Sequence, residues 1–246
     1  MTISTFYPDS DNDASVKAYE GNSQTWAFSR DHTGLFATDN GDAHEHLTAF
    51  IGFNVNEQGA TGYWDRMHRT IIIFDTSSIP DGDEMHEATV GLWFDESASA
   101  GITNDYSWSS SQKSIVITQG TTASDTAVVA GDYDAVKGAT KWSASFDCTF
   151  DGSANPSASG GWSDNSYSSI DLNATGLAGV SKTGVTKIAV QCEADVDDDE
   201  PSTSGNTTRQ VLMLIFARDA DGGLATSPKL VVRHGLDPFT PKIIMF

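Results

Sequence analysis

Short strand-like segments separated by turn-forming residues run along most of this chain, and they restrict its fold more than any other feature. Each segment either alternates apolar and polar residues or is rich in β-branched residues, and both patterns are typical of strands. The segments are Thr48–Val55, Thr70–Phe74, Ala88–Phe94, Ser114–Thr118, Ser143–Phe150, Ser168–Leu172, Thr186–Ala194, Arg209–Arg218 and Lys229–Arg233. Clusters of Gly, Pro, Ser and Asp, such as IPDGDE and DGSANPSASGG, separate them. This pattern predicts an all-β fold, an antiparallel two-sheet jelly-roll-like β-sandwich.

Signals for helices and for a domain boundary are weak. One short helix is expected over Asn173–Ser181, with Asn173 as its N-cap. The Ser/Gly-rich stretch Gly152–Asp164 resembles a linker, but the strands on either side lack enough partners alone, so a surface loop is expected. We therefore predict one domain over residues 1–234 and a C-terminal docking tail over residues 235–246. The tail ends in four apolar residues, which should dock on this sandwich or on a neighbouring subunit.

The charge of the chain excludes several classes of partner. Lys and Arg total 14 against 34 Asp and Glu, which gives a formal net charge of −20. Such a surface repels phosphate backbones and anionic lipids, so neither nucleic acid nor membrane insertion is expected. The N-terminal residues MTISTFYPDSDND have neither the basic nor the apolar part of a signal peptide, so synthesis in the cytoplasm is expected. Cys148 and Cys192 form either a disulfide between adjacent strands or, as we favour, two buried thiols.

The segment Arg69–Leu92, RTIIIFDTSSIPDGDEMHEATVGL, carries the most specific local pattern. Its apolar residues from Ile71 to Phe74 point alternately to opposite faces, which predicts a central strand buried on both sides. Asp75 is expected to accept a backbone N–H bond from Ser77 or Ser78 in an Asx turn. These features favour a structural role for Asp75 over a catalytic one.

The same segment resembles the DNRLRE, or disaggregatase-related, domain family. That family has an Arg-led strand ending in FD, a polar turn with IP, an acidic turn and a strand beginning near Ala. The matching residues here are Arg69, Phe74, Asp75, Ser77, Ile79, Pro80, Ala88 and Leu92. The segment SPKLVV, Ser227–Val232, is similar to the family's final strand. TFYPDSD and Asp171–Val190 are similar to uncharacterised phage and environmental proteins.

The resemblance implies a jelly-roll sandwich related to carbohydrate-binding modules, without shared catalytic residues. It favours a non-catalytic structural or adhesive protein on a virion or extracellular surface, such as a phage decoration, fibre or tail protein. Homo-oligomers or contacts with other virion proteins are expected, through Phe239–Phe246. A carbohydrate-binding module for a host or environmental polysaccharide is the alternative. A polysaccharide-degrading enzyme comes third, because the sequence has no GxSxG, HExxH or P-loop pattern.

Two acidic clusters offer carboxylate oxygens with a spacing suited to structural Ca²⁺, and no other cofactor is expected. Their proposed ligands are Asp9, Asp11, Asp13 and Glu20 in the first cluster and Asp195, Asp197 and Asp199 in the second. The first cluster has EF-hand spacing, but Ala14 occupies the position that needs glycine, so a simpler site in a β-loop is the hypothesis. The alternative for both clusters is a solvated acidic loop.

Aromatic residues in polar surroundings are the candidates for contact with a glycan, because sugar rings stack on flat aromatic faces. Trp108 lies in NDYSWSSS with Tyr106, and Trp162 lies in GGWSDNSY with Tyr167. Packing of these rings against the chain's own sandwich is the alternative.

Overall fold

Twelve strands and four short helices make up the part of the chain that the computed structural model describes, residues 1–18, 24–33, 36–39, 48–55, 64–93, 114–148, 166–201, 210–216 and 224–235. The strands are β1 (Thr2–Phe6), β2 (Pro8–Ala18), β3 (Phe36–Asp39), β4 (Thr48–Val55), β5 (Trp64–Asp75), β6 (Met85–Trp93), β7 (Ser114–Gln119), β8 (Phe146–Asp147), β9 (Tyr167–Asp171), β10 (Val185–Cys192), β11 (Gln210–Phe216) and β12 (Lys229–His234). The helices are α1 (Trp26–Asp31), α2 (Asp132–Ala135), α3 (Ala174–Gly179) and α4 (Glu193–Asp197).

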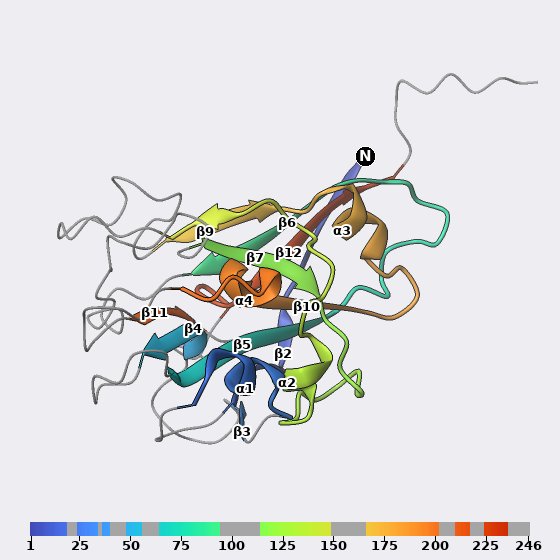
Figure 1. The fold of residues 1–246 in the computed structure, drawn as a ribbon. Coiled ribbons are helices and arrows are strands. Elements are labelled where there is room, and N and C mark those ends of the chain that lie inside the picture. The colour runs from blue at the N-terminus through green and yellow to red at the C-terminus, as the bar shows by residue number, and fades with distance from the viewer. Residues whose placement is uncertain are drawn as a thin grey trace, which may run out of the picture.

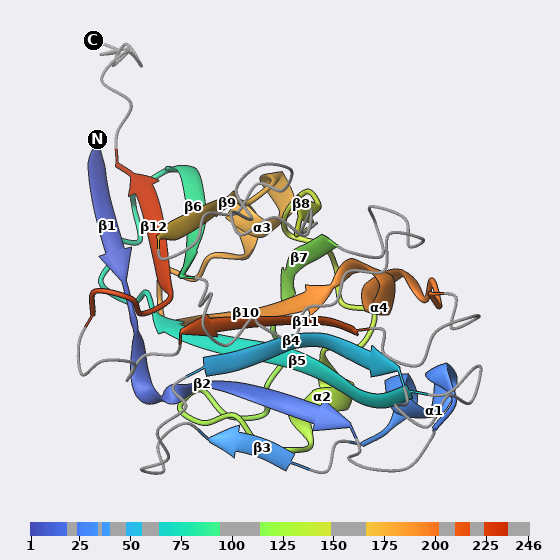
Figure 2. The ribbon, with the colours of Figure 1, turned by 90° about the vertical axis from the view of Figure 1, so that its left-hand side faces the viewer.

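The strands form two antiparallel sheets that stack on each other (Figures 1 and 2). The small sheet has the order β1-β12-β6-β9. The large sheet has the order β11-β4-β5-β10-β7-β8, with β2 paired to β5 and β3 paired to β2. Between β5 and β10 the chain crosses from one sheet to the other repeatedly, as in a jelly roll. The predicted fold class, an all-β two-sheet sandwich, is confirmed.

The long strand β5 organises the large sheet because three strands pair with it. One edge of β5 pairs with β2. The other edge is shared, since β10 pairs as far as Val190 beside Thr70, and β4 pairs from Gly52 beside His68. Arg69 therefore lies where this edge changes its partner from β10 to β4. The chain turns away into α4 directly after β10, so α4 lies close to this fork.

The inner layer, which we define as the apolar residues between the two sheets, closes the sandwich. Both sheets contribute to it, and all its members are buried. They are Phe6, Ile72, Phe74, Ile79, Ala88, Val90, Leu92, Ile115, Ile117, Trp142, Cys148, Ile170, Val180, Ile188, Val190, Leu230 and Val232.

The outer layer, on the opposite face of the large sheet, is covered by helices. Residues of α1, α2 and α4 pack there against strand residues, and these helices lie over the large sheet in the view of Figure 1. Its members are Val16, Trp26, Trp64, Met67, Ile71, Ile73, Val128, Tyr133, Val136, Ala189, Cys192 and Ala194. Ile71 and Ile73 face this layer while Ile72 and Phe74 face the inner one, so the prediction that both faces of β5 are buried is confirmed.

Several local predictions are also confirmed. Asn173 caps α3, because its side chain accepts a hydrogen bond from the N–H of Gly176 at 2.9 Å. The N–H of Ser77 donates to the Asp75 carboxylate at 3.0 Å in the expected Asx turn. Cys148 and Cys192 are buried free thiols, as favoured. Burial raises the pKa of Cys192 to about 12.

Other boundaries differ from the prediction. The segment Ser143–Phe150 contains only the two-residue strand β8, and its last two residues lie outside the described part. The strand predicted over Thr186–Ala194 ends at Cys192, because α4 begins at Glu193. Strands β1 to β3 were not predicted. The loop predicted over Gly152–Asp164 and the tail after residue 235 lie outside the described residues. None of the helices in the described ranges is long and apolar enough to cross a bilayer.

Candidate functional site

Helix α1 is anchored on one side and open on the other. Thr25 caps it by accepting a hydrogen bond from the N–H of Phe28 at 3.2 Å. On the inner side, the buried Trp26 ring packs edge-on against Trp64 with the ring centroids 5.0 Å apart. The indole N–H of Trp26 also donates to Asp198 at 3.0 Å. These contacts fix the helix, and its outward side chains are therefore presented in a defined arrangement.

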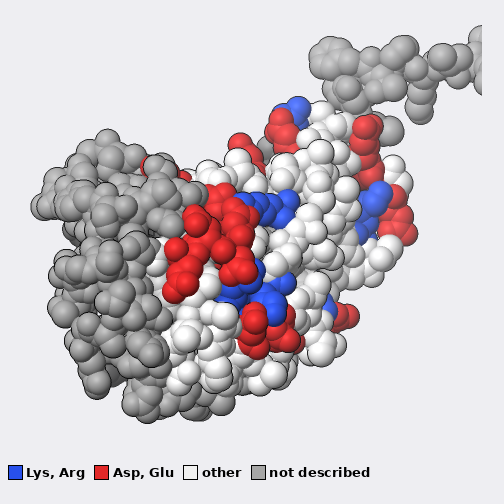
Figure 3. Space-filling model, in the orientation of Figure 1, with Lys and Arg blue, Asp and Glu red and all other residues white. Residues whose placement is uncertain are grey.

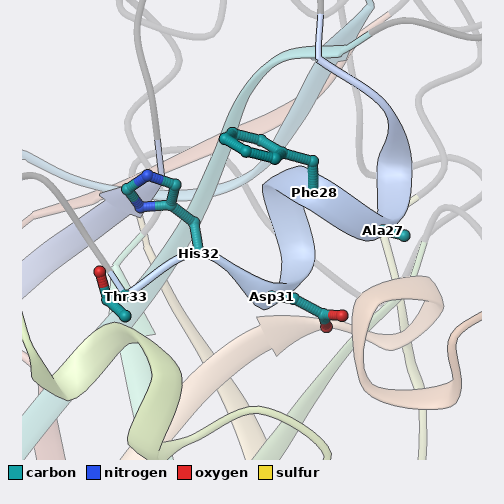
Figure 4. A pocket seen from close by; sticks show the side chains of 5 residues that line it. All are labelled: Ala27, Phe28, Asp31, His32 and Thr33. Carbon is teal, nitrogen blue, oxygen red and sulfur yellow. The ribbon is translucent and has the colours of Figure 1, made fainter.

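The outward side of α1 forms the α1 pocket, a shallow hollow of about 390 Å³ (Figure 4). Phe28 keeps 46% of its surface exposed, and the centroid of its ring lies 5.4 Å from that of His32. Asp31 accepts a hydrogen bond from Lys137 at 2.9 Å, and this contact lowers the pKa of Asp31. An exposed ring beside groups that can donate and accept hydrogen bonds suits a polar ring-shaped ligand. The pocket is lined by Ala27, Phe28, Asp31, His32 and Thr33.

A buried ion pair lies beneath the helices of the outer layer. The Arg69 guanidinium donates to both carboxylate oxygens of Asp195, at 2.7 and 2.8 Å, and to the carbonyl of Tyr133 at 2.6 Å. It also lies over the Tyr133 ring, 4.0 Å from its centroid. The Arg69 and Asp195 side chains are only 0% and 2% exposed. Burial alone would lower the pKa of Arg69, but the charge of Asp195 raises it instead.

The second acidic cluster is therefore part of a network of ion pairs and hydrogen bonds. The Asp195 carboxylate is held by Arg69, Asp197 accepts from Lys141 at 2.7 Å, and Asp198 pairs with Arg30 at 3.0 Å. Figure 3 shows acidic and basic side chains side by side on the face that carries α4 in Figure 1. Of the three proposed Ca²⁺ ligands here, only Asp199 has no side-chain bond of its own described. Within the described residues, no group of three or more His, Cys, Asp or Glu is placed to hold a metal ion.

The first acidic cluster lies on a strand instead of a loop. Asp9, Asp11 and Asp13 belong to β2, whose backbone pairs with β5. Glu20 lies outside the described residues.

Of the four aromatic residues proposed for glycan contact, the structure describes only Tyr167. Its ring stands edge-on to Trp93 at a centroid distance of 5.2 Å, and Lys229 lies 3.5 Å above it. Its hydroxyl donates to the carbonyl of Ser227 at 2.7 Å. These contacts join β9 to the segment before β12. Tyr106, Trp108 and Trp162 lie outside the described residues.

The α1 pocket was not predicted from the sequence. The only local signal is the order Thr25, Phe28, His32, in which a capping residue is followed by two aromatic residues at helical spacing. That signal predicts a helical turn but gives no reason to expect its outer side to be exposed.

No protein-family model matches this chain, and no curated protein matches it.

Proposed function

We propose that this chain is a structural or adhesive β-sandwich displayed on a virion or extracellular surface, as a decoration, fibre or tail protein. The proposal rests mainly on the central strands β5 and β10 of the large sheet, which are buried on both faces, and on the buried ion pair of Arg69 and Asp195. Such a sheet is a stiff support, and it leaves edges and loops for contacts with other molecules. The net charge of −20 supports display, because it favours solubility and limits non-specific association.

Contacts with further copies or with other virion proteins belong to this proposal. Among the described strands, β1 forms an edge of the small sheet and carries Ile3 with 69% of its surface exposed. The C-terminal residues Phe239–Phe246 add an apolar segment to the sequence. Edges and apolar ends are the parts of a sandwich that pair with neighbouring chains.

Sedimentation velocity of the full chain tests the assembly. We expect a defined oligomer that dissociates in the double variant Ile243→Ser/Phe246→Ser and persists in the control Lys242→Ser. A wild-type chain that stays monomeric at high concentration would contradict assembly through this segment.

A second candidate function, glycan binding, is supported by the α1 pocket. Phe28 offers an exposed ring for stacking, and Asp31, His32 and Thr33 can bond sugar hydroxyls. A glycan array probed with the full chain tests it. We expect Phe28→Ala to abolish binding and Leu224→Ala, which removes an equally exposed apolar side chain, to leave it unchanged. Binding that survives Phe28→Ala but is lost in Trp108→Ala or Trp162→Ala would place the glycan elsewhere.

Structural Ca²⁺ remains a hypothesis for the first acidic cluster. If Asp9, Asp11 and Asp13 help to bind the ion, chelation should lower the melting temperature by several degrees through ligand linkage. An unchanged melting curve in chelator would remove this hypothesis.

A further inference from the structure

Three residues from distant parts of the chain form one line of hydrogen bonds at the end of the small sheet. The Ser4 hydroxyl oxygen lies 2.9 Å from Nε2 of His234. Nδ1 of the same ring lies 2.7 Å from a carboxylate oxygen of Asp83. The order hydroxyl, imidazole, carboxylate, with the two ring nitrogens used in this sense, is the arrangement that activates a serine nucleophile.

Regular structure fixes two members of this line. β1 pairs with β12 so that Thr2 lies opposite His234 and Ser4 lies opposite Val232. Ser4 and His234 are therefore diagonal neighbours on one face of the sheet, within reach of each other's side chains. That face is the one that points into the sandwich, because Val232 belongs to the inner layer.

The third member, Asp83, is held by its own turn. The turn between β5 and β6 is closed by the N–H of Asp83, which donates to the carbonyl of Pro80 at 3.0 Å. Lys182 reaches across and donates to the carbonyls of Asp81 and Asp83, at 2.6 and 3.0 Å. The backbone of the turn that carries Asp83 is thus anchored by a separate segment of the chain.

The hydrogen-bond partners determine which tautomer the neutral ring adopts. A carboxylate can only accept, so Nδ1 of neutral His234 carries the hydrogen that faces Asp83. Nε2 then has a free lone pair and accepts the proton of the Ser4 hydroxyl. This is the tautomer that a general base needs in order to deprotonate a serine.

The three residues are exposed to different degrees, in a way that suits a nucleophile and its base. His234 is 3% exposed and Asp83 retains 24% of its side-chain surface, whereas Ser4 is half-buried on an edge strand. The base is shielded from water and the nucleophile remains within reach. Among the described strands β1 pairs only with β12, so its other edge has no strand partner there.

We propose that Ser4, His234 and Asp83 form a nucleophilic triad that cleaves small acyl esters. The Ser4 oxygen forms a bond to the ester carbonyl carbon while its proton passes to Nε2 of His234. The bond to the leaving alcohol then breaks, and the alcohol departs with that proton, which leaves an acylated Ser4. Water adds to the acyl carbon, His234 takes a proton from the water and returns it to Ser4, and a carboxylic acid is released. Asp83 is a positioning residue in this scheme.

This activity goes beyond the proposed display function. The display proposal stands even if the triad proves to be inactive. The activity departs from the expectation of a non-catalytic chain, which rested on the family resemblance and on the lack of local sequence motifs. Triads are recognised by geometry and not by sequence position, so three residues this far apart leave no such motif.

A fluorophosphonate probe tests the nucleophile directly. The full wild-type chain is treated with the probe, and the adduct is located by peptide mass spectrometry. We expect a single adduct on Ser4, absent after His234→Gln and retained in the exposed-serine control Ser169→Ala. A folded wild-type protein without an adduct on Ser4 overturns the proposal, whatever the variants do.

Turnover of 4-nitrophenyl acetate separates chemistry from a merely structural contact. We expect Ser4→Ala and Asp83→Asn to lower kcat/KM by about a thousand-fold and Glu84→Gln, a change at the adjacent exposed carboxylate, to leave it unchanged. Near-ultraviolet circular dichroism verifies the fold of each variant. Wild-type turnover no faster than that of folded Ser4→Ala would show that these hydrogen bonds only join the two ends of the chain.

Discussion

The two faces of the large sheet bury their side chains by different means. The inner layer is closed by buried apolar residues from both sheets. The outer layer is closed by three short helices, of which α2 has four residues and α4 has five. Helices this short are marginal alone and bury little apolar surface. The ion pair of Arg69 and Asp195 connects α4 to β5. It fixes a helix that apolar contacts alone would hold only weakly.

The two layers share the strand β5, which contributes side chains to both. Arg69 follows the same alternation as Ile71 and Ile73, so it points into the outer layer from the fork of β5. Its bonds reach α2 through the Tyr133 carbonyl, α4 through Asp195 and the carbonyl of Arg30 in α1. One buried side chain thus connects all three covering helices to the sheet.

Removal of Asp195 should lower the free energy of unfolding more than the other changes proposed here. It tests directly whether the outer layer depends on its ion pair. Asp195→Ala leaves the Arg69 charge buried without its partner, so we expect unfolding free energy to fall by about 3–5 kcal/mol. Urea unfolding at neutral pH measures it. The double variant Arg69→Met/Asp195→Leu should recover most of the loss, because apolar residues replace the pair. The exposed control Asp134→Ala should change little, and a loss below about 1 kcal/mol for Asp195→Ala would contradict the structural role.

Overfilling of the inner layer should have the next largest effect. A Cβ atom at Gly176 would lie 2.7 Å from both the Cβ and the carbonyl oxygen of Trp142, and neither can move freely. We expect Gly176→Ala to destabilise the protein by about 1–3 kcal/mol, despite the better helix propensity of alanine. Thermal unfolding measures it against Gly82→Ala, where nothing lies within 4 Å. Equal melting temperatures for the two variants would show that the inner layer is loose.

The adjacent residues Ile71 and Ile72 provide a matched test of the two layers. Both are fully buried, one in each layer, and the same methylene is removed by Ile71→Val and Ile72→Val. We expect each to cost about 1 kcal/mol, because both layers are closely packed. Urea unfolding of both variants measures the two losses of unfolding free energy. A much smaller loss for Ile71→Val would mean that the helices cover the sheet without packing tightly on it.

Several strands could be predicted because their sequences are rich in apolar and β-branched residues. Thr48–Val55 was predicted with the bounds of β4, and Lys229–Arg233 within one residue of β12. Helix α3 could be predicted from Asn173, because the side chain of an N-cap accepts a hydrogen bond from a residue only three positions later. The polar strand β2, PDSDNDASVKA, shows no such enrichment, so its pairing with β5 is decided by tertiary contacts.

The charged part of the outer layer could not be predicted. Five acidic residues in DVDDDE suggest a solvated loop or a cation, whereas Asp195 is neutralised by an arginine 126 residues earlier in the chain. No local sequence pattern predicts such a distant partner. The same limit applies to Ser4 and His234, which come together only because the first and last described strands pair.

The smallest effect concerns Lys141, at the half-exposed rim of the outer layer. Burial opposes its charge, but hydrogen bonds to Asp197 and Glu193 outweigh burial and raise the pKa of Lys141 above its ordinary value of 10.5. A raised pKa in the folded state means that the stabilisation is complete below pH 10.5 and is lost as the pH rises through the higher folded value. Because Lys141 is 31% exposed, we expect Lys141→Met to cost less than about 1 kcal/mol at neutral pH. Urea unfolding at pH 8 and pH 11.5 should show this difference shrinking at the higher pH. In a background of Glu193→Gln/Asp197→Asn, Lys141→Met should cost almost nothing at either pH, and a cost that persisted there would place the lysine's contribution in its packing instead of its charge.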